Sequence, residues 1–117
     1  MTQNINSTRY YSRRQEDSVA ELIDGYVVPN SGAGHFQKGD VINKDISLLC
    51  ECKTCVKEKN SFSIKKEWIV KNRNESFATR FSNQAIAFNF GPDQENYFVI
   101  NERLMRYLVE KLNEENS

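Results

Sequence analysis

The chain has 117 residues, of which 38% are hydrophobic and 27% charged, and its 16 basic side chains balance 16 acidic ones. These values predict one domain over residues 1–117 with a single core, an N-terminal arm at 1–11 and a flexible tail at 113–117. They exclude a membrane-spanning helix, because the apolar runs are far too short, and the polar N-terminus favours a soluble protein of the cytoplasm.

The N-terminal third predicts a helix followed by a short strand. Ser12 and Gln15 have the spacing of a capping box, which satisfies free N–H groups at a helix start. Apolar residues then recur at helical spacing, namely Val19, Ala20, Leu22 and Ile23. Gly25 is suited to ending this helix. Residues 26–28 are typical of a short strand, and residues 30–39 predict a loop rich in glycine and polar side chains.

The middle of the chain predicts a pair of strands and a second helix. Residues 40–42 and 46–53 are expected to pair around a turn at 43–45. Ser63 is expected to cap the helix that follows. The apolar residues of that helix are Trp68, Ile69, Phe77 and Phe81, and we expect Trp68 and Phe77 in the core.

The last third predicts two further strands and a helix. Residues 85–90 are apolar on both faces, as in a buried central strand, and a turn at 91–93 leads to a strand at 97–100. Asn101 is expected to cap the final helix. One apolar stripe runs along that helix through Leu104, Met105, Leu108, Val109 and Leu112.

These elements follow the order α-β-β-β-α-β-β-α. The strand–helix–strand unit in the middle implies a parallel pair of strands joined by a right-handed crossover. The fold class is therefore α/β, with a mixed β-sheet flanked by helices.

Three charged residues on the paired strands can meet on one face. Side chains alternate along a strand, so Glu51 and Lys53 share a face that Cys50 and Cys52 do not. If Asp40 begins the neighbouring strand, its carboxylate can approach that of Glu51. Two close carboxylates repel each other unless a cation lies between them, and such oxygen ligands suit Mg²⁺ or Mn²⁺. A nearby lysine can orient water and stabilise charge on a phosphate.

A further carboxylate lies on the first predicted helix. Glu16 precedes Val19 and Ala20 by one turn and falls on the apolar face that contains Ile23. A carboxylate on a buried helix face indicates part of a site.

Four segments of the first half resemble the PD-(D/E)XK nuclease superfamily. They are Gln15-Glu16, Val28-Pro29-Asn30-Ser31-Gly32-Ala33-Gly34, Lys38-Gly39-Asp40-Val41 and Leu49-Cys50-Glu51-Cys52-Lys53-Thr54. Within the superfamily they are most similar to archaeal-type Holliday-junction resolvases and small phage-encoded resolvase-like proteins. The second half is similar only in its expected order of elements.

The resemblance implies a restriction-endonuclease-like core and an Mg²⁺-dependent endonuclease in which Mn²⁺ can substitute. It implies that Asp40, Glu51, the backbone carbonyl of Cys52 and Glu16 form the metal site, and that Lys53 acts on the attacking water. Ser31 occupies the place of a loop serine that assists cleavage. The substrate would be DNA, in particular a four-way junction, and the resolvases act as two-fold dimers.

Candidate contacts to DNA are basic or polar residues near this site. Arginines cluster at the start of the chain and lysines in its middle, and a phosphate-binding surface needs such local positive charge even when the net charge is zero. The candidates are Arg9, Arg13, Arg14, Ser31, His35, Lys38 and Lys57.

Three alternatives remain open from the residues. Cys50, Cys52 and Cys55 with His35 could bind zinc in a nucleic-acid-binding or interaction module. The nuclease could instead be a restriction-type, repair or nicking enzyme that acts on another form of DNA. A catalytically silent DNA-binding relative is the third, although the presence of Asp40, Glu51 and Lys53 argues against it.

Overall fold

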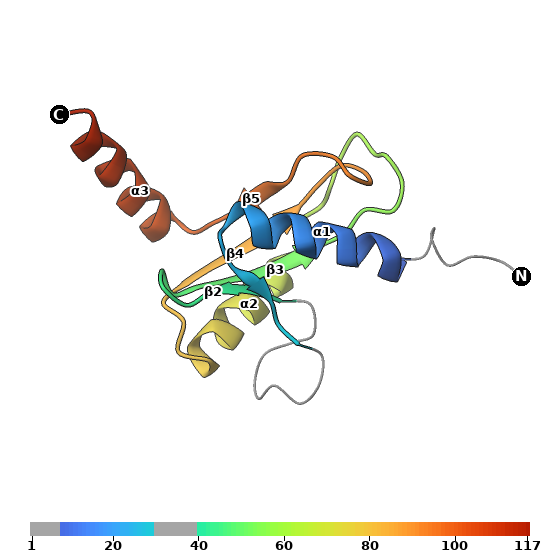
Figure 1. The fold of residues 1–117 in the computed structure, drawn as a ribbon, viewed down its shortest axis with the longest axis horizontal. Coiled ribbons are helices and arrows are strands. Elements are labelled where there is room, and N and C mark those ends of the chain that lie inside the picture. Colours follow the sequence, from blue (N-terminus) through green and yellow to red (C-terminus); the bar gives the residue numbers. More distant parts are fainter. Residues whose placement is uncertain (1–7, 30–39) are drawn as a thin grey trace, which may run out of the picture.

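A computed structural model describes residues 8–29 and 40–117 of the chain. The elements are α1 (Thr8–Leu22), β1 (Tyr26–Val27), β2 (Val41–Asn43), β3 (Leu48–Lys53), α2 (Lys66–Ala78), β4 (Asn83–Phe88), β5 (Tyr97–Val99) and α3 (Glu102–Glu115) (Figure 1). The order α-β-β-β-α-β-β-α and the mixed sheet confirm the α/β prediction. No helix in the described ranges is long and apolar enough to cross a membrane.

The five described strands form one sheet in the order β1-β2-β3-β4-β5. Strands β3 and β4 are parallel, and every other neighbouring pair is antiparallel. A parallel pair needs a long connection, which α2 supplies between β3 and β4. This confirms the predicted parallel pair in the middle of the chain.

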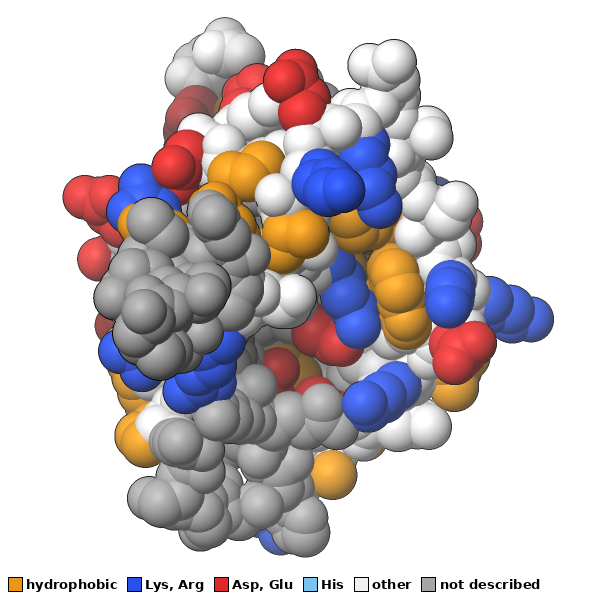
Figure 2. Space-filling model, turned by 90° about the vertical axis from the view of Figure 1, so that its right-hand side faces the viewer, with side chains coloured by type: hydrophobic (Ala, Val, Ile, Leu, Met, Phe, Trp, Pro, Cys, Tyr) orange, Lys and Arg blue, Asp and Glu red, His pale blue; other side chains and the backbone are white. Residues whose placement is uncertain are grey.

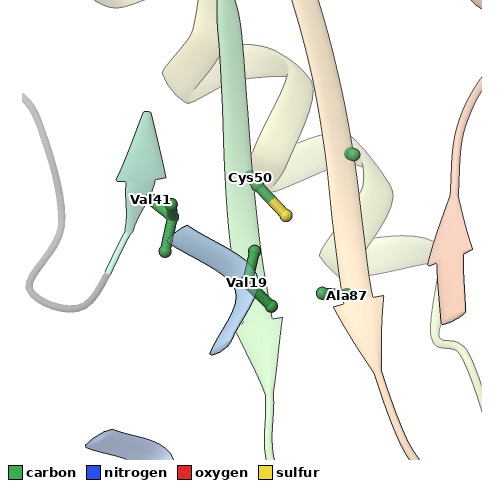
Figure 3. Close-up of a cluster of buried hydrophobic side chains, with 5 residues drawn as sticks. Val19, Val41, Cys50 and Ala87 are labelled. Carbon is green, nitrogen blue, oxygen red and sulfur yellow. The ribbon is translucent and has the colours of Figure 1, made fainter. Parts of the chain in front are cut away.

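The core of the protein lies on both faces of this sheet. On one face Val19 of α1 packs against Val41, Cys50 and Ala87, with Ala85 in the same cluster (Figure 3). Burying a side chain the size of valine contributes about 1.5–3 kcal/mol to the free energy of unfolding. The cluster therefore fixes α1 over the centre of the sheet.

A second cluster consists of Val28, Ile42, Leu49 and Phe81. Ile42 and Leu49 are register partners on β2 and β3, so their side chains lie on the face opposite to Val41 and Cys50. Leu49, Glu51 and Lys53 occupy every second position of β3, so their side chains share one face of the sheet. Glu51 and Lys53 therefore lie on this second face.

The predicted starts of the first two helices are wrong. Helix α1 already includes Thr8, so Ser12 is inside it, and residues 8–11 of the expected arm are helical. Helix α2 begins at Lys66, and its N-cap Lys65 makes no side-chain capping bond, so Ser63 is not the cap. Phe81 lies beyond the end of α2 and packs on the sheet. A capping motif is local, and tertiary contacts decide where a helix begins.

Two apolar residues expected to be buried are exposed. Leu22 on α1 is 62% exposed and Phe77 on α2 is 69% exposed. Both lie on helix faces that point away from the sheet, although their spacing along the chain fits an apolar face. Residues 113–115 of the expected tail belong to α3.

Gly25 lies directly against the backbone of β2. Asp24, with φ of 57°, ends α1, and the Gly25 N–H donates to the carbonyl of Ala20 at 2.8 Å. A Cβ atom on Gly25 would lie 2.2 Å from the carbonyl oxygen of Ile42. Glycine is therefore required here by close approach to the strand, and not only by the end of the helix.

We expect Gly25→Ala to lower the free energy of unfolding by about 2 kcal/mol, because the added methyl group must push α1 away from β2. Urea unfolding followed by far-UV circular dichroism measures this change. Leu22→Ala is the control, since that exposed position should change stability by less than about 0.5 kcal/mol. An unchanged midpoint for Gly25→Ala would mean that the helix does not approach the strand so closely.

Helix α3 begins as predicted and then leaves the body of the protein. The Asn101 side chain accepts a hydrogen bond from the Leu104 N–H at 2.9 Å, which confirms the cap. The helix projects away from the sheet (Figure 1), and none of its residues is buried. Its apolar stripe is therefore exposed in the single chain.

Candidate active site

Asp40, the residue just before β2, lies across from Glu51 of β3, so the strand expected to start at 40 starts at Val41. Val41 is the register partner of Cys50 in the antiparallel pair, so the next position along places Asp40 across from Glu51. Cβ atoms of directly opposed residues are about 5 Å apart. Asp40 is 2% exposed and Glu51 is 8% exposed. Two acidic residues are thus buried at opposed positions of the sheet.

Lys53 lies beside Glu51 on the same face of β3. Its Nζ is 3.0 Å from Oε2 of Glu51, and both side chains are largely shielded from solvent. The same ammonium group lies 4.3 Å from the centre of the Trp68 ring on α2. A cation over an indole face is stabilised by the quadrupole of the ring. Lys53 is therefore held between a carboxylate and an aromatic surface.

The role of Trp68 was missed in the sequence, where it was expected in the core. Trp68 is only half-buried, and it contacts Phe62 as well as Lys53. The predicted strand–helix–strand unit could have indicated this contact. Helix α2 connects β3 to β4, so an aromatic residue in its first turns can reach the end of β3.

Glu51 has one buried oxygen that no protein donor reaches. Lys53 binds Oε2, whereas Oε1 is buried and has no hydrogen-bond partner among the described residues. Burying a carboxylate oxygen costs free energy unless a donor or a cation reaches it. The carboxylate of Asp40 across the strands adds a second negative charge. The pair of acids therefore favours a cation between them.

Glu16 and Asp40 both act electrostatically on Cys52. The pKa of Cys52 is raised well above its ordinary value by a hydrogen bond with Cys50, by burial, and by electrostatic interaction with Cys50, Glu16 and Asp40. Both carboxylates therefore act on the Cys52 thiol, which lies on the α1 face of β3, opposite to the face of Glu51 and Lys53. Glu16 is half-buried on α1, in agreement with its predicted place on the inner side of that helix.

These residues fit Mg²⁺ better than a metal that needs a full cage of protein ligands. The described residues contain no group of three or more His, Cys, Asp or Glu side chains arranged to hold a metal ion. Mg²⁺ keeps several waters and is bound through one or two carboxylates together with substrate phosphates. The opposed pair of Asp40 and Glu51 offers that number of carboxylates. The roles of Glu16 and of the Cys52 carbonyl as ligands stay predictions.

The three cysteines do not form a zinc cluster in the described part of the chain. Cys50 is fully buried in the core, and the Cys55 thiol donates to the carbonyl of Lys57 at 2.8 Å. A structural zinc site needs several such ligands together, and the described residues contain no group of three or more that could hold a metal ion. His35 lies outside the described residues.

Gln15 connects α1 to the sheet through its side chain. The prediction that it forms part of a helix cap is wrong, because α1 already begins at Thr8. Its side chain is buried and accepts a hydrogen bond from Thr54 Oγ1 at 2.8 Å. It donates to Asn96 Oδ1 at 3.2 Å and to the carbonyl of Ala87 at 3.5 Å. These contacts hold the position of α1 that contains Glu16 against the ends of β3 and β4. A polar side chain on the inner face of a helix was the signal for this role.

The described candidates for DNA contact are exposed basic side chains. Arg9 and Arg13 on α1 are exposed, as is Lys57 after β3. Arg14 is exposed as well, but its Nε lies 2.7 Å from Oδ1 of Asp93, and this hydrogen-bonded carboxylate raises the pKa of Arg14. Asp93 therefore offsets part of the positive charge of α1.

The remaining candidates, Ser31, His35 and Lys38, lie outside the described residues. Figure 2 shows one side of the molecule, where acidic side chains lie in a hollow with basic and hydrophobic side chains around it. A hollow of this kind combines negative charge at its base with positive charge at its rim.

Comparison of the chain with models of protein families, with curated proteins and with solved structures found no match.

Proposed function

We propose that this protein is a metal-dependent endonuclease that hydrolyses phosphodiester bonds in DNA. The observation that supports it most is the buried Asp40–Glu51 pair with Lys53 Nζ 3.0 Å from Glu51. Buried carboxylates next to a shielded lysine are costly to a fold and are typical of functional sites. The proposed location is the cytoplasm, where the free thiols of the chain stay reduced.

Each residue has a distinct part in the proposed reaction. Asp40 and Glu51 would hold Mg²⁺, which supplies Lewis acidity toward the phosphate and its attacking water. Lys53, fixed by Glu51 and the Trp68 ring, would orient that water and stabilise the charge that develops on the phosphate. Glu16 would add negative charge on the α1 side of the site. Hydrolysis by this route needs no covalent intermediate.

The proposed substrate is branched DNA, with a four-way junction as the first choice. Support for the junction comes from the resemblance to the resolvases, and support for DNA comes also from exposed Arg9 and Arg13 on the helix that contains Glu16. Basic side chains on such a surface bind phosphates without regard to sequence. A two-fold dimer would present two such sites to the two strands that a resolvase must cut.

The test is cleavage of labelled four-way junction, flap, nicked and linear duplex DNA, each with Mg²⁺ and with EDTA. We expect paired, symmetric cuts in the junction that disappear with EDTA. Mg²⁺-dependent cuts in the other forms alone would retain the nuclease and reject the junction as substrate. If no DNA is cut under any condition, the proposed function is wrong, and zinc analysis of the purified protein becomes the next measurement.

A further inference from the structure

A polar cavity of about 320 Å³ lies between α1 and the ends of β3 and β4. Its α1 wall consists of residues about one turn apart on one face of the helix, namely Tyr11, Arg14, Gln15 and Ser18. Thr54, directly after β3, and Asn89, directly after β4, line the other side. The volume lies at the lower end of the range of about 300–1,000 Å³ for ligand sites. The cavity therefore suits a small ligand.

The position of the cavity in the sheet is typical of a binding site. Strands β3 and β4 are parallel, so their carboxyl ends meet at one edge, and open α/β sheets bind ligands outside such ends. Thr54 directly follows Lys53 of the proposed active site. The cavity lies on the α1 side, however, whereas the side chains of Glu51 and Lys53 lie on the opposite face. It is therefore a second site next to the acidic centre.

Asn89 differs from the other buried polar side chains around the cavity. Thr54 Oγ1 donates to Gln15 Oε1 at 2.8 Å, and Gln15 Nε2 donates to Asn96 Oδ1 at 3.2 Å, so these groups hold the wall together. Asn89 is only 3% exposed, and its Oδ1 has no hydrogen-bond partner among the described residues. A buried amide without a partner costs free energy. Because Asn89 lines the cavity, a ligand there is well placed to supply the missing hydrogen bond.

The lining favours a flat, uncharged ligand with hydrogen-bonding edges. Side-chain amides carry a donor and an acceptor side by side, which matches the edge of a nucleobase. Four amides line the cavity, and they are Gln15, Asn89, Gln94 and Asn96. Tyr11 adds an aromatic ring on which a base can stack. Among the described lining residues the basic one is Arg14, and its Nε lies 2.7 Å from Oδ1 of Asp93, so an anionic group would find no free cation.

We propose that this cavity binds one unpaired nucleobase, with the amide of Asn89 bonded to an edge of the base and Tyr11 stacked on its face. The source of the base rests on the proposed function, since it would be a DNA strand bound at the neighbouring acidic centre. A base enters such a pocket only after it has left the helical stack, which costs least where it is already unpaired. The site would therefore direct the protein toward DNA with an unpaired base.

Fluorescence anisotropy in EDTA tests this proposal with two labelled duplexes, one fully paired and one with a single unpaired base. We expect the wild-type chain to bind the second duplex about 10-fold more tightly, which is the size of one stacking contact. Tyr11→Leu should bind both duplexes equally, with the affinity for the paired duplex unchanged. Tyr10→Leu is the matched control, because Tyr10 is the neighbouring tyrosine and does not line the cavity. This variant should keep the preference.

Asn89→Leu separates a role in binding from a role in folding. Leucine has a similar size and removes an amide whose Oδ1 lacks a partner, so the free energy of unfolding in urea should equal or exceed that of wild type. The preference for the unpaired base should nevertheless be lost. Reduced stability together with an unchanged preference would show that the amide serves the fold, and would overturn its assignment to a ligand.

Nucleoside monophosphates titrated into the wild-type chain and Tyr11→Leu without DNA distinguish the sources of the base. Nucleotide binding that needs Tyr11, without any preference between the duplexes, would assign the cavity to the base of a free nucleotide. Equal affinity of the wild-type chain for both duplexes, together with no nucleotide binding, would overturn the proposal. None of these measurements involves Mg²⁺ or cleavage. A protein that prefers the unpaired base and cuts no DNA would therefore retain the cavity as a base-binding site and lose the proposed nuclease function.

Discussion

Asp40→Asn should reduce Mg²⁺-dependent DNA cleavage by at least about 10³-fold, which corresponds to about 4 kcal/mol of lost transition-state stabilisation. Asp40 is buried opposite Glu51, so the substitution removes one of the two carboxylates proposed to hold the metal. The amide has nearly the same shape as the carboxylate. The change therefore acts on the charge of the site rather than on packing.

Two further measurements separate loss of chemistry from loss of folding. DNA binding in EDTA, followed by gel shift, should stay within a few-fold of wild type, because the proposed phosphate contacts are basic residues such as Arg9 and Arg13 on α1. The exposed Asp45 in the turn between β2 and β3 provides the matched control, and Asp45→Asn should cleave at the wild-type rate. If Asp40→Asn unfolds the protein, or cleaves normally, Asp40 is not a metal ligand of a nuclease.

Lys53→Met should lower the maximal rate of cleavage by about 10² to 10³-fold and leave the Mg²⁺ concentration required for half-maximal activity nearly unchanged. Methionine keeps the apolar contact with the Trp68 ring but removes the ammonium group 3.0 Å from Glu51. The loss should therefore fall on the chemical step. A single-turnover cleavage assay at saturating DNA measures that step directly.

A second lysine next to the same ring tests whether the loss of cleavage is specific to Lys53. Lys65 Nζ lies 5.8 Å from the centre of the Trp68 ring and is exposed, so Lys65→Met should have little effect. Equal losses from both variants would indicate a general effect of positive charge on DNA binding. A normal rate for Lys53→Met would remove the lysine from the proposed mechanism.

The parts of the fold that follow from a repeating pattern of side chains or from the order of elements could be predicted from the sequence. Alternation along one strand is enough to place Glu51 and Lys53 on one face, and the strand–helix–strand pattern is enough to predict the parallel pair of β3 and β4. These parts of the fold depend on neighbours in the chain. The register that sets Asp40 opposite Glu51 was not predicted: the turn was expected at 43–45, whereas β2 extends through Asn43 and residues 44–47 connect it to β3.

Features that depend on distant residues were not predictable. Gln15 fits a capping motif locally, yet its partners Thr54 and Asn96 are 39 and 81 residues away. The contact of Trp68 with Lys53 likewise depends on how α2 packs over the sheet. The stripe on α3 was correct as a pattern, but a pattern does not tell whether a helix is covered by its own chain.

The order of the strands in the sheet has a consequence for how the protein forms during synthesis. Strands β1 to β5 lie side by side in the order in which they are made, so each new strand can add to the one before it. Helix α1, made first, nevertheless depends on Ala87 and Asn96 for the bonds that hold Gln15. The position of α1, and with it that of Glu16, is therefore fixed only after most of the chain has left the ribosome.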